Sequence, residues 1–184
     1  MNYDEIYNEV KNMLSEKRFM HSERVVKRAI EYAKVYNVDI ETVKLVAISH
    51  DIAKNLSSEE NQKYIKEYNI KLDEIEKINN SLLHAKIGAE ICKNRYNFTE
   101  DMVNSIKYHT TGRKNMSILE KIIYLADATE EGREYCSANF VDIIKEDIDK
   151  GMFEISKWSL TYLLNNNAII HPDTIKCYNF YNKN

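Results

Sequence analysis

Residues 43–54 read VKLVAISHDIAK, and this stretch decides how the fold is interpreted. Its aliphatic residues recur at helical spacing, so it is predicted to be a helix with one buried face. His50 and Asp51 follow directly on this apolar segment. A carboxylate and an imidazole in such surroundings are costly unless they are hydrogen-bonded, ion-paired or bound to a metal. Lys54 comes four residues after His50 and is expected on the same helix face.

Glycine and proline are scarce, with four Gly and one Pro in 184 residues. Because both residues interrupt regular structure, their scarcity indicates long helices joined by short polar turns. No segment alternates apolar and polar residues as a half-buried strand would. A chain of this length can bury about two-thirds of its unfolded surface in one domain. The predicted fold is therefore all-α, with residues 1–184 forming a single helical-bundle domain.

Polar residues at the expected helix starts divide the chain. Asp39, Thr99 and Ser117 are expected to cap helices, and Pro172 suits the first turn of a short last helix. Residues 56–80 are the least apolar part and are interpreted as a peripheral helical excursion. The other predicted helices span residues 4–15, 22–37 (after a basic turn at 17–19), 39 to about 55, 58–68, 82–96, 99–109, 117–127, 141–148 and 153–164.

The overall charge and the cysteines exclude several classes of protein. A formal net charge of −3 without a basic run gives no general attraction to nucleic acid. The N-terminus does not resemble a signal peptide, and no apolar run approaches the roughly 18 residues that span a bilayer. Cys92, Cys136 and Cys177 are far apart and form no CxxC pair, which argues against a zinc ribbon or a disulfide framework. We expect a soluble, cytoplasmic protein that binds neither nucleic acid nor membranes.

Four of the five histidines, together with two acidic residues, lie on or beside the predicted core helices. A single histidine on an apolar helical face is more often a hydrogen-bonded core residue than a ligand. Several such polar residues are better explained together, as ligands that converge inside a bundle. Imidazoles and carboxylates form a site for a divalent cation that activates water. The residues that carry this hypothesis are His21, His50, Asp51, His84, His109 and Asp127.

The types of these side chains restrict the metal. Imidazoles and carboxylates without a thiolate favour iron, manganese or a similar ion such as cobalt in five- or six-coordination. A closed tetrahedral zinc site would leave no open position for water. Lys54 can offer a point charge to a phosphate, although a cation near a helix C-terminus also has a purely structural explanation.

The order H…HD…H…H…D, with HDIAK at residues 50–54, resembles the HD-domain superfamily of metal-dependent phosphohydrolases. Three further blocks resemble its YqeK family: LLHAKIGAEI at 82–91, YHTTGRKNMSILEKIIYLAD at 108–127 and IIHPDTIKCYN at 169–179. The resemblance runs along nearly the whole chain. It implies an HD-type helical bundle that uses iron or another transition metal. It also implies symmetrical hydrolysis of a bis(5'-nucleosyl) tetraphosphate, such as diadenosine tetraphosphate into two ADP.

The resemblance also implies roles for individual residues. The metal ligands it implies are His21, His50, Asp51 and Asp127, for one tightly bound ion. His84 and His109 correspond to positions that complete a second metal or contact phosphates, and both alternatives stay open. The catalytic set is Asp51, Lys54, His84 and His109. The residues implied in nucleotide binding are Arg18, Lys54, His84, His109, Thr110, Arg133, His171 and Thr174.

One turn departs from the family pattern. After the Ala-Asp motif the family usually carries E-P-x-R, whereas this chain reads Glu130-Glu131-Gly132-Arg133. Because glycine is conformationally free, the placement of Arg133 is not fixed by the resemblance.

Alternative functions are an HD hydrolase acting on a nucleoside monophosphate or a guanosine polyphosphate, and a non-catalytic metal- or nucleotide-binding sensor. A structural bundle with buried histidines is a third. The metal identity, the base preference and a possible homodimer stay open.

Overall fold

Helix-capping side chains set many element boundaries in the computed structural model, which describes residues 2–133 and 138–182. Asp39, Thr99 and Ser117 each accept a hydrogen bond from a backbone N–H in the first turn of the helix that follows, as predicted. Over the described ranges the chain forms helices and no strand, which confirms the all-α prediction. The helices are α1 (Tyr3–Met13), α2 (Glu16–Tyr36), α3 (Ile40–Ser49), α4 (Ser58–Glu67), α5 (Glu74–Ile78), a 3₁₀ turn (Asn80–Leu82), α6 (Leu83–Tyr96), α7 (Glu100–Lys107), α8 (Ile118–Thr129), α9 (Ala138–Glu146), α10 (Ile148–Asn165) and α11 (Pro172–Tyr181).

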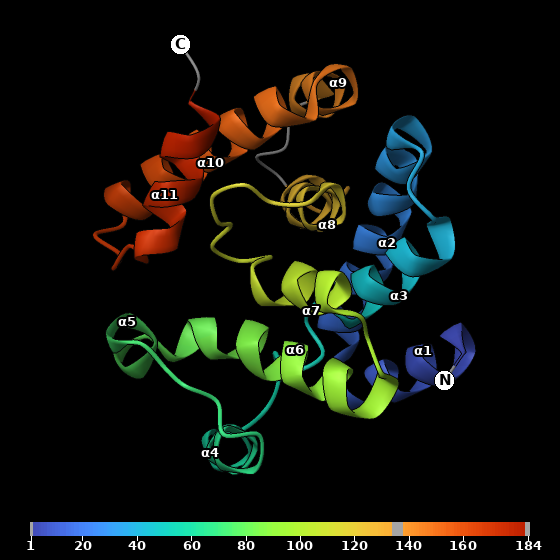
Figure 1. Cartoon of the computed structure of the whole chain (residues 1–184), viewed down its shortest axis with the longest axis vertical. Helices are drawn as coiled ribbons and strands as arrows, with labels where there is room; N and C mark the ends of the chain where they lie inside the picture. Colours follow the sequence, from blue (N-terminus) through green and yellow to red (C-terminus); the bar gives the residue numbers. More distant parts are fainter. Residues whose placement is uncertain (1, 134–137, 183–184) are drawn as a thin grey trace.

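The core forms where α8 packs against α2 and α7, and where α3 packs against α2. In Figure 1, α8 lies near the centre of the view, with α2 and α3 on one side and α7 below it. Apolar residues of these helices are almost fully buried, for example Val25 and Ala29 of α2 and Ile122 and Leu125 of α8. Their burial drives the bundle together and fixes the relative positions of the helix ends.

The remaining helices cover the core from two directions. The C-terminal helices α9, α10 and α11 lie on one side of α8, and α4 and α5 lie at the opposite periphery beside α6 (Figure 1). No residue of α4 is buried and, within residues 56–80, Glu76 alone is buried, so the interpretation of this segment as a peripheral excursion is confirmed. None of the helices in the described ranges is both long and apolar enough to cross a bilayer.

The predicted start of the second helix was wrong. We expected a basic turn at residues 17–19 and a helix from Ser22, but α2 begins at Glu16. Phe19 is buried against the core, which holds the first turn of the helix in place. As a result, Arg18 and His21 lie on the same rigid helix.

Other boundaries also differ from the predictions. We expected Lys54 to share a helix face with His50, but α3 ends at Ser49 and Lys54 lies in a turn closed by its N–H bonding to the carbonyl of Asp51. His109 lies beyond the end of α7, and Asp127 lies inside α8, which continues to Thr129. The helices predicted at residues 141–148 and 153–164 start earlier, at Ala138 and Ile148. Gly151 therefore lies inside α10.

Gly112 fixes the loop after His109 against the C-terminal helix. It has φ +65°, and a Cβ built there would lie 2.6 Å from the Sγ of Cys177 in α11. We predict that Gly112→Ala lowers the free energy of unfolding by about 2–4 kcal/mol, because a left-handed backbone and a steric clash both oppose the methyl group. Urea denaturation would measure this loss.

Cys177→Ala supplies the matched control. The double variant should lose less stability than the sum of the two single variants, because removing the sulfur relieves the clash but not the backbone strain. Strict additivity of the two losses would contradict the packing described for Gly112.

Candidate metal centre

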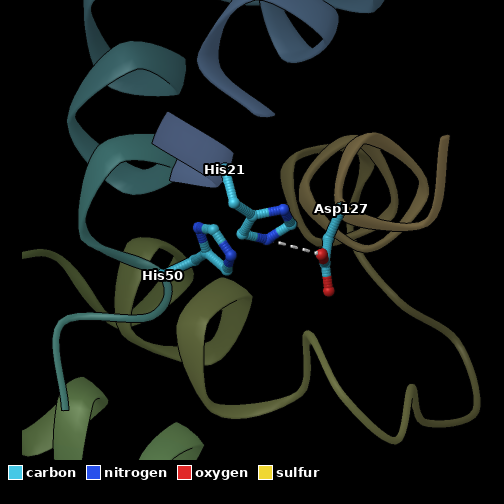
Figure 2. A group of neighbouring side chains, drawn as sticks. All are labelled: His21, His50 and Asp127. Atoms are coloured by element: carbon cyan, nitrogen blue, oxygen red, sulfur yellow. Dashed lines mark ion pairs between the residues drawn. The ribbon is translucent and has the colours of Figure 1, made fainter. Parts of the chain in front are cut away.

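Two imidazoles and one carboxylate from three separate segments meet inside the bundle. His21 lies near the start of α2, His50 directly follows α3, and Asp127 lies in the last turn of α8. The Nε2 atom of His21 is 3.1 Å from Oδ1 of Asp127, and potential ligand atoms of all three residues lie within 4.8 Å of one another. Figure 2 shows these side chains converging from the three elements. Residues remote in sequence therefore place metal-binding atoms in one small volume.

Asp51 lies at the centre of a second group that shares His50. Ligand atoms of His50, Asp51 and His109 also lie within 4.8 Å of one another. Oδ1 of Asp51 is 3.2 Å from Nε2 of His84 and 3.5 Å from Nε2 of His109. The structure thus brings together all six residues singled out in the sequence, four imidazoles and two carboxylates.

Each of the four histidines is held through its Nδ1 atom. The Nδ1–H groups of His50, His84 and His109 donate to backbone carbonyl oxygens three residues earlier, each at 2.7 Å. His21 directs Nδ1 at 3.1 Å to a carboxylate oxygen of Glu130. Because none of these acceptors carries a proton, the bonds place the hydrogen on Nδ1 and leave a lone pair on Nε2 of the neutral ring. All four Nε2 atoms are therefore available to the shared interior space.

The protonation states suit metal binding. Burial lowers the pKa of His50 to about 4, and it does the same for His84, so both rings are neutral near pH 7. Burial alone would raise the pKa of Asp51, but the surrounding histidines, His50 foremost, hold it well below its ordinary value. The site therefore combines neutral imidazoles with an ionised carboxylate, which are the forms that coordinate cations.

Three buried polar atoms of this cluster lack a hydrogen-bond partner among the described residues. They are Nε2 of His21, Nε2 of His50 and Oδ1 of Asp51. A buried polar atom without a partner costs about 1–3 kcal/mol, so an unpaired set on adjoining residues requires an explanation. A cation bound between these atoms would satisfy all three. The residues present therefore fit a divalent transition metal.

Glu130 supports this centre, a role that was not predicted from the sequence, where Glu130 stood out only as part of the departing turn. It is buried and receives hydrogen bonds from Nε of Arg24 and from the N–H of Gly132, each at 2.5 Å, in addition to its contact with His21. Although burial opposes it, the bond from Arg24 and the other donors lower the pKa of Glu130. An acid three residues after Asp127 on an apolar helix was the available signal.

Four of the predicted phosphate-contact residues surround the centre. Arg18 donates to Asp51 at 2.9 Å, and Arg133 donates to Asp127 at 2.5 Å. The Nζ atom of Lys54 is 3.2 Å from Nε2 of His84. Thr110 places its hydroxyl 3.2 Å from Nε2 of His109. These cations and the hydroxyl lie where an anion at the centre would meet them.

The departure at Glu130-Glu131-Gly132 does not leave Arg133 unplaced. The side chain of Glu130 accepts from the N–H of Gly132, and the N–H of Arg133 bonds to the carbonyl of Glu130. The Nε of Arg133 also donates to the carbonyl of Asp127 at 3.0 Å. The turn is therefore fixed by hydrogen bonds instead of by a proline ring.

His171 and Thr174 do not join the cluster. His171 caps α11, and its Nε2 donates to Asp73 at 2.8 Å, while Thr174 is buried in the first turn of that helix. His171 does share the lining of a cavity of about 90 Å³ with Thr110. Asp73 accepts from His171, and Glu76 accepts from Lys86 at 2.5 Å. These polar atoms therefore have partners, unlike the three atoms of the metal centre that lack one.

Comparison with known proteins agrees with this geometry. Residues 18–132 match the HD domain family. The chain is 33% identical to the symmetrical bis(5'-nucleosyl)-tetraphosphatase of Staphylococcus aureus, over 99% of this chain and 95% of that protein. It is 36% identical to the protein of the same name from Halalkalibacterium halodurans, over 97% of this chain and 96% of that protein.

A solved structure is similar over almost its whole length. It is described as a predicted HD superfamily hydrolase involved in NAD metabolism from Clostridium acetobutylicum, and it shares 33% sequence identity and a TM-score of 0.92 with this chain. The alignment covers 98% of this chain and 97% of that structure. On its converging histidines and acids and on these matches, the chain belongs to the HD-domain family of metal-dependent phosphohydrolases and, within it, to the YqeK-type symmetrical bis(5'-nucleosyl)-tetraphosphatases.

Proposed function

We propose that this protein hydrolyses bis(5'-nucleosyl) tetraphosphates symmetrically, converting diadenosine tetraphosphate into two ADP. The observation that carries the proposal is the buried cluster in which four Nε2 atoms and two carboxylates converge beside Arg18, Lys54 and Arg133. The names and the near full-length coverage of the relatives support the substrate class.

His21, His50, Asp51 and Asp127 would hold the tightly bound metal, and His109, which groups with His50 and Asp51, would help to hold a second. The donor set favours iron, with manganese or cobalt as alternatives. When bound, such a metal activates water and polarises a phosphoryl oxygen. Glu130 contributes by holding the ring of His21 through Nδ1.

The cationic side chains act on the phosphates. The oxygen of the attacking water forms a bond to one inner phosphorus, while the bond from that phosphorus to the oxygen bridging the two inner phosphates breaks. Arg18, Lys54 and Arg133 stabilise the negative charge that grows on the phosphoryl oxygens, and one well-placed donor contributes about 3 kcal/mol. His84 and His109 line the same space with Nε2 atoms 3.2 Å apart, whose lone pairs can accept a proton.

We also propose that residues 1–184 act as one catalytic domain in the cytoplasm, with a small nucleotide as the ligand and no nucleic acid. The candidate centre combines side chains from α2, α6, α8 and the segments after α3 and α7, which supports a single domain. Cys92 and Cys177 are buried free thiols, in keeping with a reducing compartment. Cys136 lies outside the described residues.

Product identification tests the reaction directly. Metal-loaded protein should convert diadenosine tetraphosphate into ADP as the sole nucleotide product, measured by chromatography over a time course. Formation of AMP and ATP would exclude symmetrical cleavage. Turnover of nucleoside monophosphates or guanosine polyphosphates in its place would favour another HD hydrolase. Nucleotide binding without turnover on iron, manganese and cobalt would favour a sensor.

His50→Ala and Asp127→Ala should each abolish metal content and turnover together. Each substitution removes one of the ligands that form a group with His21. Elemental analysis and ADP formation would be measured on the same samples. Lys54→Ala is the control that separates the two effects: it should keep the metal but lose roughly 10²-fold in kcat. Full turnover in either ligand variant would contradict the assignment of the centre.

Glu130→Ala should weaken metal affinity by about 10- to 100-fold, because the ring of His21 loses the acceptor that orients it. Competition with a chromophoric chelator would measure the affinity. Glu131→Ala is a matched control, since this exposed neighbour pairs only with Lys27 at the surface among the described residues. Equal affinities for the two variants would show that Glu130 does not position His21.

A further inference from the structure

A cationic cleft of about 450 Å³ lies beside the metal centre, along one face of α2. Its lining contains one acid, Glu130, and the metal-centre residue His21. The cations that line it are Lys17, Arg18, Arg24, Lys54 and Arg133. Such an excess of positive charge around a volume of this size indicates an anionic ligand with several charges.

Lys17 and Arg24 are the two of these cations that the family resemblance does not assign. They lie four residues before and three residues after His21, so the three side chains share one face of α2. One cation therefore lies about one helical turn on either side of the metal-centre histidine. Phosphate groups that extend from the centre along α2 would meet both of them.

Lys17 has no ion-pair partner within residues 2–133 and 138–182, and it is exposed. The three arginines of the cleft are paired with acids, Arg18 with Asp51, Arg24 with Glu130 and Arg133 with Asp127, and Lys54 contacts His84. Gly132 allows the guanidinium of Arg24 to lie close over its backbone, since a Cβ there would be 2.7 Å from Nη2 of Arg24. Of the two cations that the resemblance does not assign, Lys17 is therefore unpaired and Arg24 is held in position.

The cavity that contains Thr110 in its lining offers much less space than the cationic cleft. The cavity beside Thr110 measures about 90 Å³, whereas ligand pockets typically measure about 300–1,000 Å³. A cleft of about 470 Å³ shares Asp73, His171 and Asp173 with this cavity, but no residue of the metal centre lines it, whereas His21 lines the cationic cleft.

We infer that the cationic cleft binds one nucleoside diphosphate half of the substrate, and that Lys17 and Arg24 contact its phosphates on the side away from the metal centre. The inference rests on the proposed function and adds the location of one half of the substrate. It also makes Lys17 a determinant of specificity, because a nucleoside monophosphate held at the centre would not extend along α2 to reach it.

Lys17→Ala tests this assignment, with Lys34→Ala as the matched control. The Lys34→Ala substitution removes the same charge from the same helix, at an exposed position outside the cleft. Lys17→Ala should raise the KM for diadenosine tetraphosphate about 3- to 10-fold with little change in kcat, as expected for the loss of one charged contact to the bound substrate. Lys17→Arg should restore KM, and Lys34→Ala should leave it unchanged.

Binding of ADP to the metal-loaded protein gives a second readout that needs no turnover. Calorimetry should show ADP binding weakened about 3- to 10-fold in Lys17→Ala relative to the wild type and to Lys34→Ala. If the wild type produces two ADP, and Lys17→Ala leaves both the KM and the ADP affinity unchanged, the inference is overturned and the proposed function stays intact. A wild type that releases no ADP from diadenosine tetraphosphate but binds ADP through Lys17 would refute the proposed function while supporting the cleft.

Discussion

The outward anchoring of four imidazole rings is the constraint on which the site depends. Each Nδ1 atom of His21, His50, His84 and His109 bonds to a carbonyl or carboxylate oxygen behind it, so each Nε2 atom is presented to the same interior space. Three of these acceptors are backbone carbonyls three residues earlier, which makes the ring orientation a consequence of local chain geometry. Free rotation of the rings would let them satisfy Nε2 elsewhere, and the converging set would be lost.

The bundle supplies the free energy that such a site costs. Buried Nε2 and carboxylate atoms without partners destabilise the fold, by about 1–3 kcal/mol for each atom. The apolar faces of α2, α3 and α8 offset this cost, since residues such as Val25, Val46 and Leu125 are fully buried in the core. The same packing holds the three helix ends in register. Stability and site geometry therefore depend on the same contacts.

Much of the fold and of the centre could be predicted from the sequence, for identifiable physical reasons. Ser117 and Thr99 form local caps, whose hydrogen bonds involve residues within one turn, so their effect is visible in the sequence. His50, Asp51 and Asp127 stood out because ionisable residues beside aliphatic runs demand a partner. The start of α2 and the role of Glu130 depend on contacts with distant residues, namely the core around Phe19 and the ring of His21. Tertiary contacts of this kind leave no local periodicity to detect.

The carboxylates and the guanidinium groups of the centre form ion pairs with each other, and each group can also bind a ligand of opposite charge. Arg18 pairs with Asp51, and Arg133 pairs with Asp127, so each carboxylate assigned to the metal is bonded to a cation assigned to phosphate. A metal cation attracts the carboxylate of each pair, and a phosphate attracts the guanidinium. Binding both ligands therefore exchanges one set of opposite-charge contacts for another and leaves no charge of these pairs unpaired in the interior. The metal binds the carboxylate of each pair, and the phosphate binds the guanidinium that this releases. Metal and nucleotide are therefore expected to favour each other's binding.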